Sequence, residues 1–200
     1  MSRPLRNTLQ SVRQPLTVTH VLAGSPRRAG TEDFIRTCFS RHYGARIPSF
    51  APNLTLLENA GGIVAATGWR CAGDEPLYLE NYLDEPIENA VARLAGQPVP
   101  RESIAEAAHL ASHRAGASLD VILTLARHLD RLGFEWVTFT ATRTLVGIFA
   151  RLGLPLLSLA SANPARLGPQ AAAWGSYYDT EPIVVAGRIR LAIEKAARHG

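Results

Sequence analysis

The feature that most constrains this fold is a strand, a loop of small residues and a long helix that follow one another over about residues 103–132. The strand is the apolar run ESIAEAAHLAS, and the helix keeps apolar residues at helical spacing until Gly133 ends it. The intervening loop SHRAGAS offers free amides at a helix N-terminus, where negative charge is stabilised. The unit predicts an α/β fold with an anion-binding loop at residues 112–118.

Strand and helix patterns flank this unit on both sides. Before it, the strands LTVTHVLAG, NLTLLEN and IVAATGWRCA accompany a helix that we expect from about Thr31, as its N-cap, to Tyr43. After it, the strands WVTFTAT and LPLLSLA and a last strand in EPIVVAG accompany the helix RTLVGIFARLG. We expect a mixed sheet, antiparallel at first and parallel in the middle, with helices on both faces.

Length and composition indicate one domain. The chain has 200 residues, of which 46% are hydrophobic and 19% charged, and no compositional break divides it. We expect a flexible N-terminal arm at 1–14, the domain at 15–187 and a basic C-terminal helix at 188–200. No signal in the chain decides between a monomer and a homodimer.

Charge and cysteine content argue against several classes of protein. The net charge of +4 comes mainly from arginine, but no basic run is interleaved with aromatic residues, so we expect no nucleic-acid partner. Cys38 and Cys71 fit no metal spacing and no disulfide framework, so we expect no metal. We find no transmembrane segment and no secretory signal, which favours a cytoplasmic location. Arginine suits phosphate groups, and a basic surface suits an acidic partner.

Glu106 is the first candidate for chemistry, because it lies inside an otherwise apolar strand. A buried carboxylate there is costly unless it is paired or functional. Burial would raise its pKa toward the range of a general base, while the alternative is a structural carboxylate paired with an arginine. His109 follows three residues later, so simple alternation places it on the opposite face. Both can line one cleft only if the strand bulges there.

Two aromatic segments are further candidates. WGSYYD, residues 174–179, predicts either a pocket rim with a proton donor or plain aromatic packing. If this segment is extended, only one of Tyr177 and Tyr178 can face the cleft, and we prefer Tyr178. The acidic segment YLENYLDEPIE contributes Glu80 and Tyr82 either as substrate contacts or as parts of a solvated loop and helix start.

Three long strings resemble the thermostable hemolysin family: EPLYLENYLDEPIE, EWVTFTATRTLVGIFARLGLPLLSLASANPARL and WGSYYDTEPIVVAG. The resemblance covers about residues 15–190. That family is similar to the GNAT acyltransferase superfamily and, more distantly, to the acyl-homoserine-lactone synthases, which take acyl groups from acyl carrier protein. The resemblance implies a GNAT-like fold whose central strands, at about 103–111 and 135–141, splay into a V-shaped cleft.

The chain departs from the patterns of these families at two places. The superfamily loop has the form Gln/Arg-x-x-Gly-x-Gly/Ala, whereas HRAGAS keeps one glycine. The hemolysin-like pattern Glu-x-Gly-Asn-Leu is represented here by Glu106-Ala-Ala-His109-Leu110, so a histidine stands at position 109.

The implied activity is transfer of an acyl group, in one reading a fatty one, from acyl-CoA or acyl carrier protein to a small amine by direct attack. The phosphopantetheine thioester would be a co-substrate, with no tightly bound cofactor. Glu106 would be the base with His109 in reserve, Tyr178 or Tyr177 the acid, and Trp174 a substrate contact beside Glu80 and Tyr82. Arg143 and Arg151 are outlying phosphate contacts. The donor-binding residues would be Leu110, Ala111, Ser112, Arg114, Ala115, Gly116, Ala117 and Ser118.

The alternative class is a membrane-active protein that acts on bilayers without catalysis. Its best feature is the basic tail at 188–199, where apolar residues stand beside charges. A short basic amphipathic helix can lie on an anionic membrane. The competing interpretation of the tail is a helix packed on the sheet.

Overall fold

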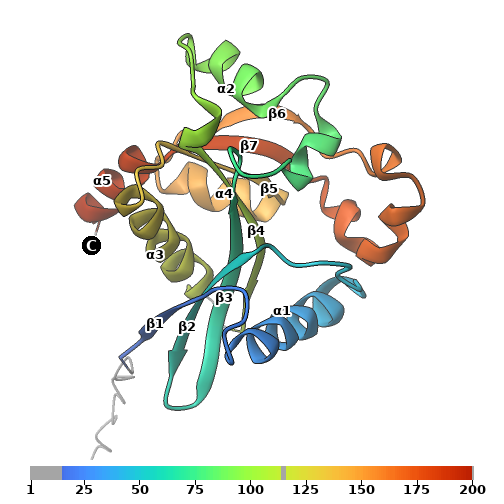
Figure 1. Ribbon diagram of the computed structural model, residues 1–200, viewed down its shortest axis with the longest axis vertical. Helices are drawn as coiled ribbons and strands as arrows, with labels where there is room; N and C mark the ends of the chain where they lie inside the picture. The colour runs from blue at the N-terminus through green and yellow to red at the C-terminus, as the bar shows by residue number, and fades with distance from the viewer. Residues whose placement is uncertain (1–14, 114–115, 200) are drawn as a thin grey trace, which may run out of the picture.

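The computed structural model describes residues 15–113 and 116–199 (Figure 1). The helices are α1 (Arg28–Tyr43), α2 (Ile87–Ala95), α3 (Ala117–Arg131), α4 (Arg143–Arg151) and α5 (Ile189–His199), and the 3₁₀ segments are η1 (Tyr78–Tyr82), η2 (Arg101–Ser103) and η3 (Pro164–Thr180). The strands are β1 (Thr17–Val21), β2 (Asn53–Asn59), β3 (Gly62–Cys71), β4 (Ile104–Ser112), β5 (Trp136–Ala141), β6 (Leu157–Ser161) and β7 (Ile183–Arg188).

The strands form one mixed sheet in the order β1-β2-β3-β4-β5-β7-β6. Only β4 and β5 pair in parallel, and the other neighbours are antiparallel. The parallel pairing joins residues 104–106 to residues 136–138, although both strands continue beyond it. The two central strands therefore separate after Glu106, as the GNAT-like prediction required.

A bulge in β4 changes which side chains share a face. Ala66 pairs with Ala111 but Gly68 pairs with Ala108, so His109 and Leu110 stand opposite a single residue of β3. His109 has a φ of 55°, a left-handed conformation uncommon for a residue with a side chain. The extra residue shifts the alternation, so His109 lies on the same face as Glu106, and Leu110 lies on the other.

Helices cover both faces of the sheet, with α1 and α3 on opposite sides of β4 (Figure 1). The first face also carries α2, η1 and η3, and the second carries α4 and α5. On the second face Ile189 is fully buried against Leu125 and Leu129 of α3, and Ile193 packs beside them. The apolar side of the C-terminal helix is therefore used in packing against α3 and the sheet.

The first helix begins earlier than its sequence pattern indicated. Helix α1 starts at Arg28, so Thr31 is an interior residue and the prediction of a Thr31 N-cap is wrong. The Thr31 hydroxyl instead donates to the carbonyl of Arg27 at 2.8 Å, a bond that a threonine inside a helix can make to the preceding turn.

Among the helices of the described residues, none combines the length and the apolar character that crossing a bilayer requires.

Candidate active site

A cavity of about 520 Å³ opens where β4 and β5 separate. Its walls include side chains of α1, η1 and η3 from one face of the sheet and of α3, α4 and α5 from the other. Because both faces contribute, the cavity passes through the gap between the two strands. Its two ends differ in chemistry, and we call them the apolar wing and the aromatic wing.

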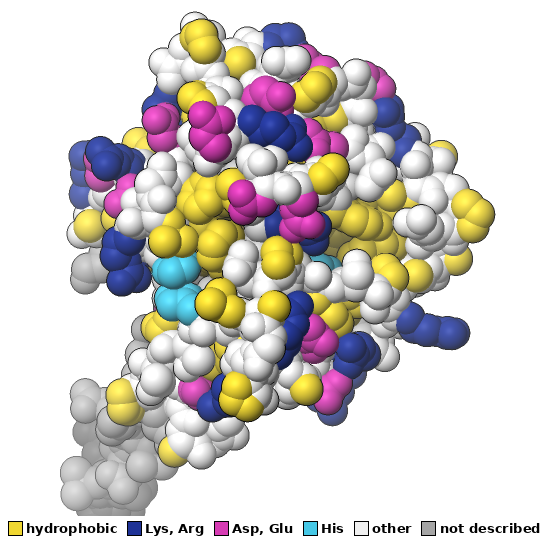
Figure 2. Space-filling view, in the orientation of Figure 1, with side chains coloured by type: hydrophobic (Ala, Val, Ile, Leu, Met, Phe, Trp, Pro, Cys, Tyr) yellow, Lys and Arg dark blue, Asp and Glu magenta, His cyan; other side chains and the backbone are white. Residues whose placement is uncertain are grey.

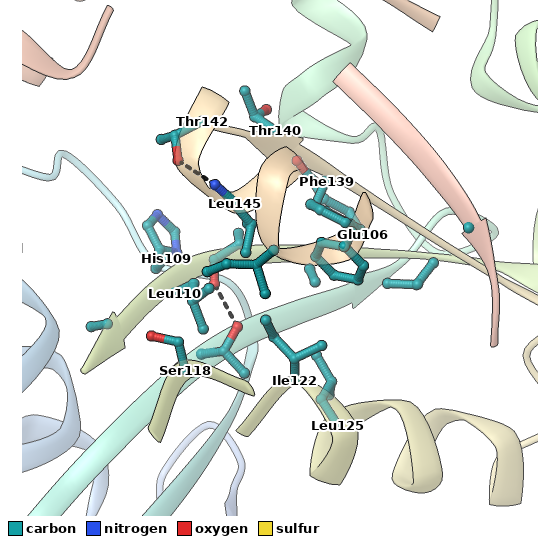
Figure 3. A pocket seen from close by; sticks show the side chains of 18 of the residues that line it. Glu106, His109, Leu110, Ser118, Ile122, Leu125, Phe139, Thr140, Thr142 and Leu145 are labelled. Atoms are coloured by element: carbon teal, nitrogen blue, oxygen red, sulfur yellow. Dashed lines mark hydrogen bonds between the residues drawn. The ribbon is translucent and has the colours of Figure 1, made fainter. Parts of the chain in front are cut away.

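The apolar wing lies on the α3 face. Figure 3 shows side chains of β4, α3, β5 and α4 turned toward a common space. Aliphatic and phenylalanine side chains with no polar atoms make up this wall, so it suits an apolar chain. We define the wing by Leu110, Ile122, Leu125, Val137, Phe139, Leu145, Ile148, Phe149, Leu154, Leu156 and Leu191.

The aromatic wing lies on the α1 face and is defined by Tyr43, Tyr78, Tyr82, Trp174, Tyr177 and Tyr178. The Tyr82 and Tyr178 hydroxyls are 2.7 Å apart, and the indole Nε1 of Trp174 donates to the Tyr78 hydroxyl at 3.0 Å. Burial raises the pKa of Tyr78, Tyr82, Tyr177 and Tyr178. These phenols therefore stay protonated near neutral pH and can donate hydrogen bonds or a proton.

The segment at 174–179 is not extended, so the condition under which only one of Tyr177 and Tyr178 could face the cleft is not met. It belongs to the 3₁₀ segment η3, and both tyrosines line the cavity. Gly175, with a φ of 54°, allows η3 to lie directly against the end of α1, because a Cβ at this position would lie 2.0 Å from the carbonyl oxygen of Tyr43. Only a glycine lets η3 approach the end of α1 so closely.

Glu106 lies at the base of the aromatic wing with 3% of its surface exposed. Its carboxylate accepts the backbone amides of Tyr78 at 2.9 Å and Leu79 at 3.1 Å, and Arg70 Nε lies 3.3 Å from Oε2. Burial raises the pKa of Glu106 to about 7, although Arg70 and the two amides oppose the rise. The carboxylate is paired with an arginine, as the structural interpretation expected, and it also lines the cavity, whereas its role as a base stays a prediction.

His109 and Arg70 carry buried polar atoms that are not satisfied. Among the described residues, His109 Nδ1 and Arg70 Nε are buried without a hydrogen-bond partner, since the Arg70 contact with Glu106 is an ion pair without hydrogen-bond alignment. Burial and the charge of Arg70 lower the pKa of His109 to about 4, so its ring is neutral. Unpaired buried polar atoms are unfavourable, and both residues line the cavity, where a ligand could satisfy them.

The loop predicted to bind the donor is only partly at the cavity. Leu110, Ala111, Ser112 and Ser118 line it, and the two serine hydroxyls are 2.7 Å apart, which joins the end of β4 to the start of α3. Gly116 is the N-cap of α3 with a φ of 85°.

Several predicted donor contacts lie elsewhere. The side chain of Ala117 is buried in the core, and Arg114 and Ala115 lie outside the described residues. Arg143 and Arg151 are exposed on α4 and do not line the cavity, and Arg143 pairs with Glu181.

Of the three predicted substrate contacts, Tyr82 and Trp174 line the cavity and Glu80 does not. The Glu80 carboxylate binds Arg101 at 2.7 and 2.8 Å and accepts the amides of Leu77 and Ile87. Burial alone would raise its pKa, but these hydrogen bonds lower it to about 2. Glu80 therefore has a structural role, in which it ties η1 to the start of α2.

Sequence reasoning missed Arg70, Tyr78 and most of the apolar wing. Arg70 was visible as a charged residue in the apolar run IVAATGWRCA, the same signal that identified Glu106. Tyr78 begins the aromatic and acidic segment YLENYLDEPIE, in which the sequence does not distinguish it from the neighbouring Tyr82. The apolar wing carries no local signal, because leucines on three helices are also what a plain core requires.

The mixed sheet, the splayed central strands and the bulged β4 define a GNAT-like fold. The family model for thermostable hemolysin matches residues 21–193, and the chain belongs to that family. No curated protein sequence matches the chain.

Solved structures of similar fold share little sequence with this chain. The N-acyl amino acid synthase FeeM from uncultured soil microbes aligns with a TM-score of 0.63 at 12% identity, covering 95% of this chain and 100% of that one. The acyl-homoserine-lactone synthase LasI gives 0.61 at 13% identity, with 90% and 95% covered. BjaI, a CoA-dependent acyl-homoserine lactone synthase solved with SAM and isopentyl-CoA, gives 0.60 at 14% identity, with 92% and 89% covered.

Proposed function

We propose that this protein is an N-acyltransferase that moves an acyl group from a thioester donor to the amine of a small molecule. The observation that carries the proposal is the cavity through the β4–β5 gap, which combines an apolar wing, a hydroxyl-rich aromatic wing and a buried carboxylate. An apolar chain and a polar acceptor can enter from opposite faces and meet at the bulge of β4. The likeness of fold to acyl-homoserine-lactone synthases and an N-acyl amino acid synthase supports this activity.

The donor that fits best is acyl-CoA or an acylated carrier protein. The acyl chain would occupy the apolar wing, and the phosphates would bind near Ser112 and Ser118 at the start of α3, where the helix dipole favours negative charge. BjaI, which shares the fold, was solved with isopentyl-CoA, and this supports CoA as the first donor to test.

The chemistry is direct attack of the amine on the thioester carbonyl. Glu106 would take a proton from the amine, directly or through a water, since its raised pKa suits a general base near neutral pH. A β-bulge leaves its extra residue outside the strand ladder, so the backbone amides around His109 and Leu110 are suited to polarise the carbonyl. Tyr178 or Tyr177 would protonate the departing thiolate.

Direct membrane lysis is less well supported. The apolar residues of α5 that would enter a bilayer are packed against α3 and the sheet. On the face shown in Figure 2, basic and acidic side chains lie beside one another over most of the surface, and basic side chains gather at the left edge, where α5 lies. Among the described residues, Arg101 pairs with Glu80 and Arg166 pairs with Asp84.

Mass spectrometry of reaction products tests the proposal. The protein is incubated with acyl-CoA donors of several chain lengths, or with acylated carrier protein, and with a mixture of small amines. We expect a new amide and free thiol in equal amounts. Absence of amide with every donor, together with dye release from anionic liposomes by the protein alone, would reverse the ranking of the two functions.

A further inference from the structure

The base of the aromatic wing holds two opposite charges side by side. Arg70 and Glu106 both line the cavity, their side chains are 14% and 4% exposed, and Nε lies 3.3 Å from Oε2. The carboxylate also accepts two backbone amides, and Arg70 has a further contact with Glu75 at 3.5 Å. A guanidinium has about five N–H donors and a carboxylate has about four acceptor sites. These contacts therefore leave unused hydrogen-bond donors on Arg70 and unused acceptor sites on Glu106.

We propose that the amine acceptor is an α-amino acid with an aromatic or bulky apolar side chain, whose carboxylate pairs with Arg70 while its amine faces Glu106. The proposal rests on the acyltransferase activity proposed above. An α-amino acid carries its ammonium and carboxylate groups on the same carbon atom, so its two opposite charges lie close together and match the Arg70–Glu106 ion pair with the signs reversed. Charge complementarity of this kind fixes orientation as well as affinity.

The rest of the wing fits the side chain of such an acceptor. The ring centroid of Trp174 lies 5.8 Å from that of Tyr78 and 5.7 Å from that of Tyr177, and Trp174 stacks parallel to His109 at 6.3 Å. Aromatic walls of this kind bind an apolar or aromatic group and offer hydroxyls to its polar end.

The charges of the cavity argue against a polyamine. Glu106 is the only carboxylate among the described residues that line the cavity, and Glu80, which was also predicted to contact the substrate, is held by Arg101 outside it. A second or third ammonium group would find no anion there, and an unpaired charge in a buried site is strongly unfavourable. The acceptor therefore brings one ammonium group and one carboxylate.

The reaction balances with these groups. The ammonium gives one proton to Glu106, and the nitrogen lone pair forms the C–N bond at the thioester carbonyl. The C–S bond breaks, and the thiolate receives a proton through a tyrosine hydroxyl as the nitrogen loses its second proton. The products are an N-acyl amino acid and a free thiol, and Glu106 returns its proton to solvent.

The test compares acceptors that differ in one group, with a single acyl-CoA donor. L-Tyrosine, tyrosine methyl ester, tyramine and spermidine are supplied separately, and kcat/KM is measured by mass spectrometry of the amide. Since a hydrogen bond to a charged group contributes about 1.5–3 kcal/mol, we expect tyrosine to exceed tyramine and the ester by about 10- to 100-fold. Spermidine should be the poorest acceptor.

A variant pair locates the effect. Arg70→Gln should bring the ratio of tyrosine to tyramine close to one, a change that a purely structural role would not produce. Arg93→Gln removes an exposed arginine that pairs with Glu85 on the surface, and it should leave the ratio unchanged.

The outcomes separate the two proposals. If tyramine or spermidine is acylated as well as tyrosine, the amino-acid acceptor is wrong while the acyltransferase activity stands. If no amine is acylated although the donor binds, the proposed function fails and the acceptor assignment fails with it. The wild-type comparison of tyrosine with its ester needs no variant, so poor folding of Arg70→Gln does not rescue the proposal.

Discussion

The two wings of the cavity share one strand but are held in different ways. On the α1 face of β4, Glu106 is fixed by two backbone amides and Arg70, and the hydroxyls of Tyr82 and Tyr178 hydrogen-bond to each other. On the α3 face, Leu110 and its neighbours on α3 and α4 are held by apolar contacts alone. The comparison teaches that the aromatic wing specifies orientation and chemistry, whereas the apolar wing specifies volume.

Changing Glu106 to glutamine should have the largest effect. General-base assistance contributes about 10²- to 10⁴-fold in rate, so Glu106→Gln should lower kcat by that range and leave the donor Kd nearly unchanged. The donor affinity is measured by titration and the fold by thermal unfolding. A fully active variant would remove Glu106 from the mechanism and leave it a structural partner of Arg70.

Two glycines of η3 test how the aromatic wing is positioned. Gly168 and Gly175 have nearly the same backbone angles, φ 55° with ψ −134° and φ 54° with ψ −130°, but only Gly175 lies against α1. Gly168→Ala should lower the free energy of unfolding by about 1–3 kcal/mol through backbone strain.

Gly175→Ala should lower the free energy of unfolding further, because its Cβ would collide with the Tyr43 carbonyl. It should also raise the KM for the amine, while Gly168→Ala should not. Denaturant unfolding and acceptor kinetics give both quantities. Equal losses for the two variants would mean that contact with α1 does not position the wing.

Filling the apolar wing should change which acyl chain length is preferred and leave the acyl-transfer reaction itself unchanged. Ile122→Phe and Leu145→Phe place added bulk in the space between α3 and α4 (Figure 3), so the preferred acyl chain should become shorter. One methylene in an apolar pocket changes kcat/KM by about 10- to 200-fold, and the longest donors should lose at least about tenfold.

A matched control uses a leucine outside the cavity. Leu94→Phe changes an exposed residue of α2 and should leave the ranking of donors of graded chain length unchanged. An unchanged ranking in Ile122→Phe and Leu145→Phe as well would place the acyl chain elsewhere.

The pH dependence of kcat distinguishes the two candidate bases. Glu106 acts as a base only when ionised and its pKa is raised to about 7, so kcat should fall by about tenfold per pH unit below that value. If His109 were the base, its pKa of about 4 would keep kcat constant down to about pH 4. The profile is measured at saturating donor and acceptor.

The same raised pKa affects stability. Because the folded state holds the proton of Glu106 more tightly than the unfolded chain does, the contribution of this group is greatest at low pH and is lost as the pH rises through about 7. Glu106→Gln should remove that part of the pH dependence of the unfolding free energy.

Sequence patterns alone predicted the main helices and strands and the carboxylate inside an apolar strand. The strand–loop–helix unit at 103–132, the mixed sheet and a GNAT-like fold follow from hydrophobic periodicity, glycine positions and the family strings, and the structure contains all three. Glu106 was identified because a carboxylate within an apolar strand can be recognised in the linear sequence. These signals are local in the sequence, so they can be recognised without knowing which residues are neighbours in space.

The assembly of the site depends on contacts between segments that are distant in the sequence. Simple alternation along β4 predicted that His109 and Glu106 lie on opposite faces of the sheet. One extra residue in the pairing of β4 with β3 brings both side chains to the same face. Arg70 meets Glu106 because their strands pair, and the apolar wing exists because β4 and β5 separate after three paired residues. Register, strand separation and the contact of Gly175 with α1 depend on pairings between distant segments, which local sequence patterns do not encode.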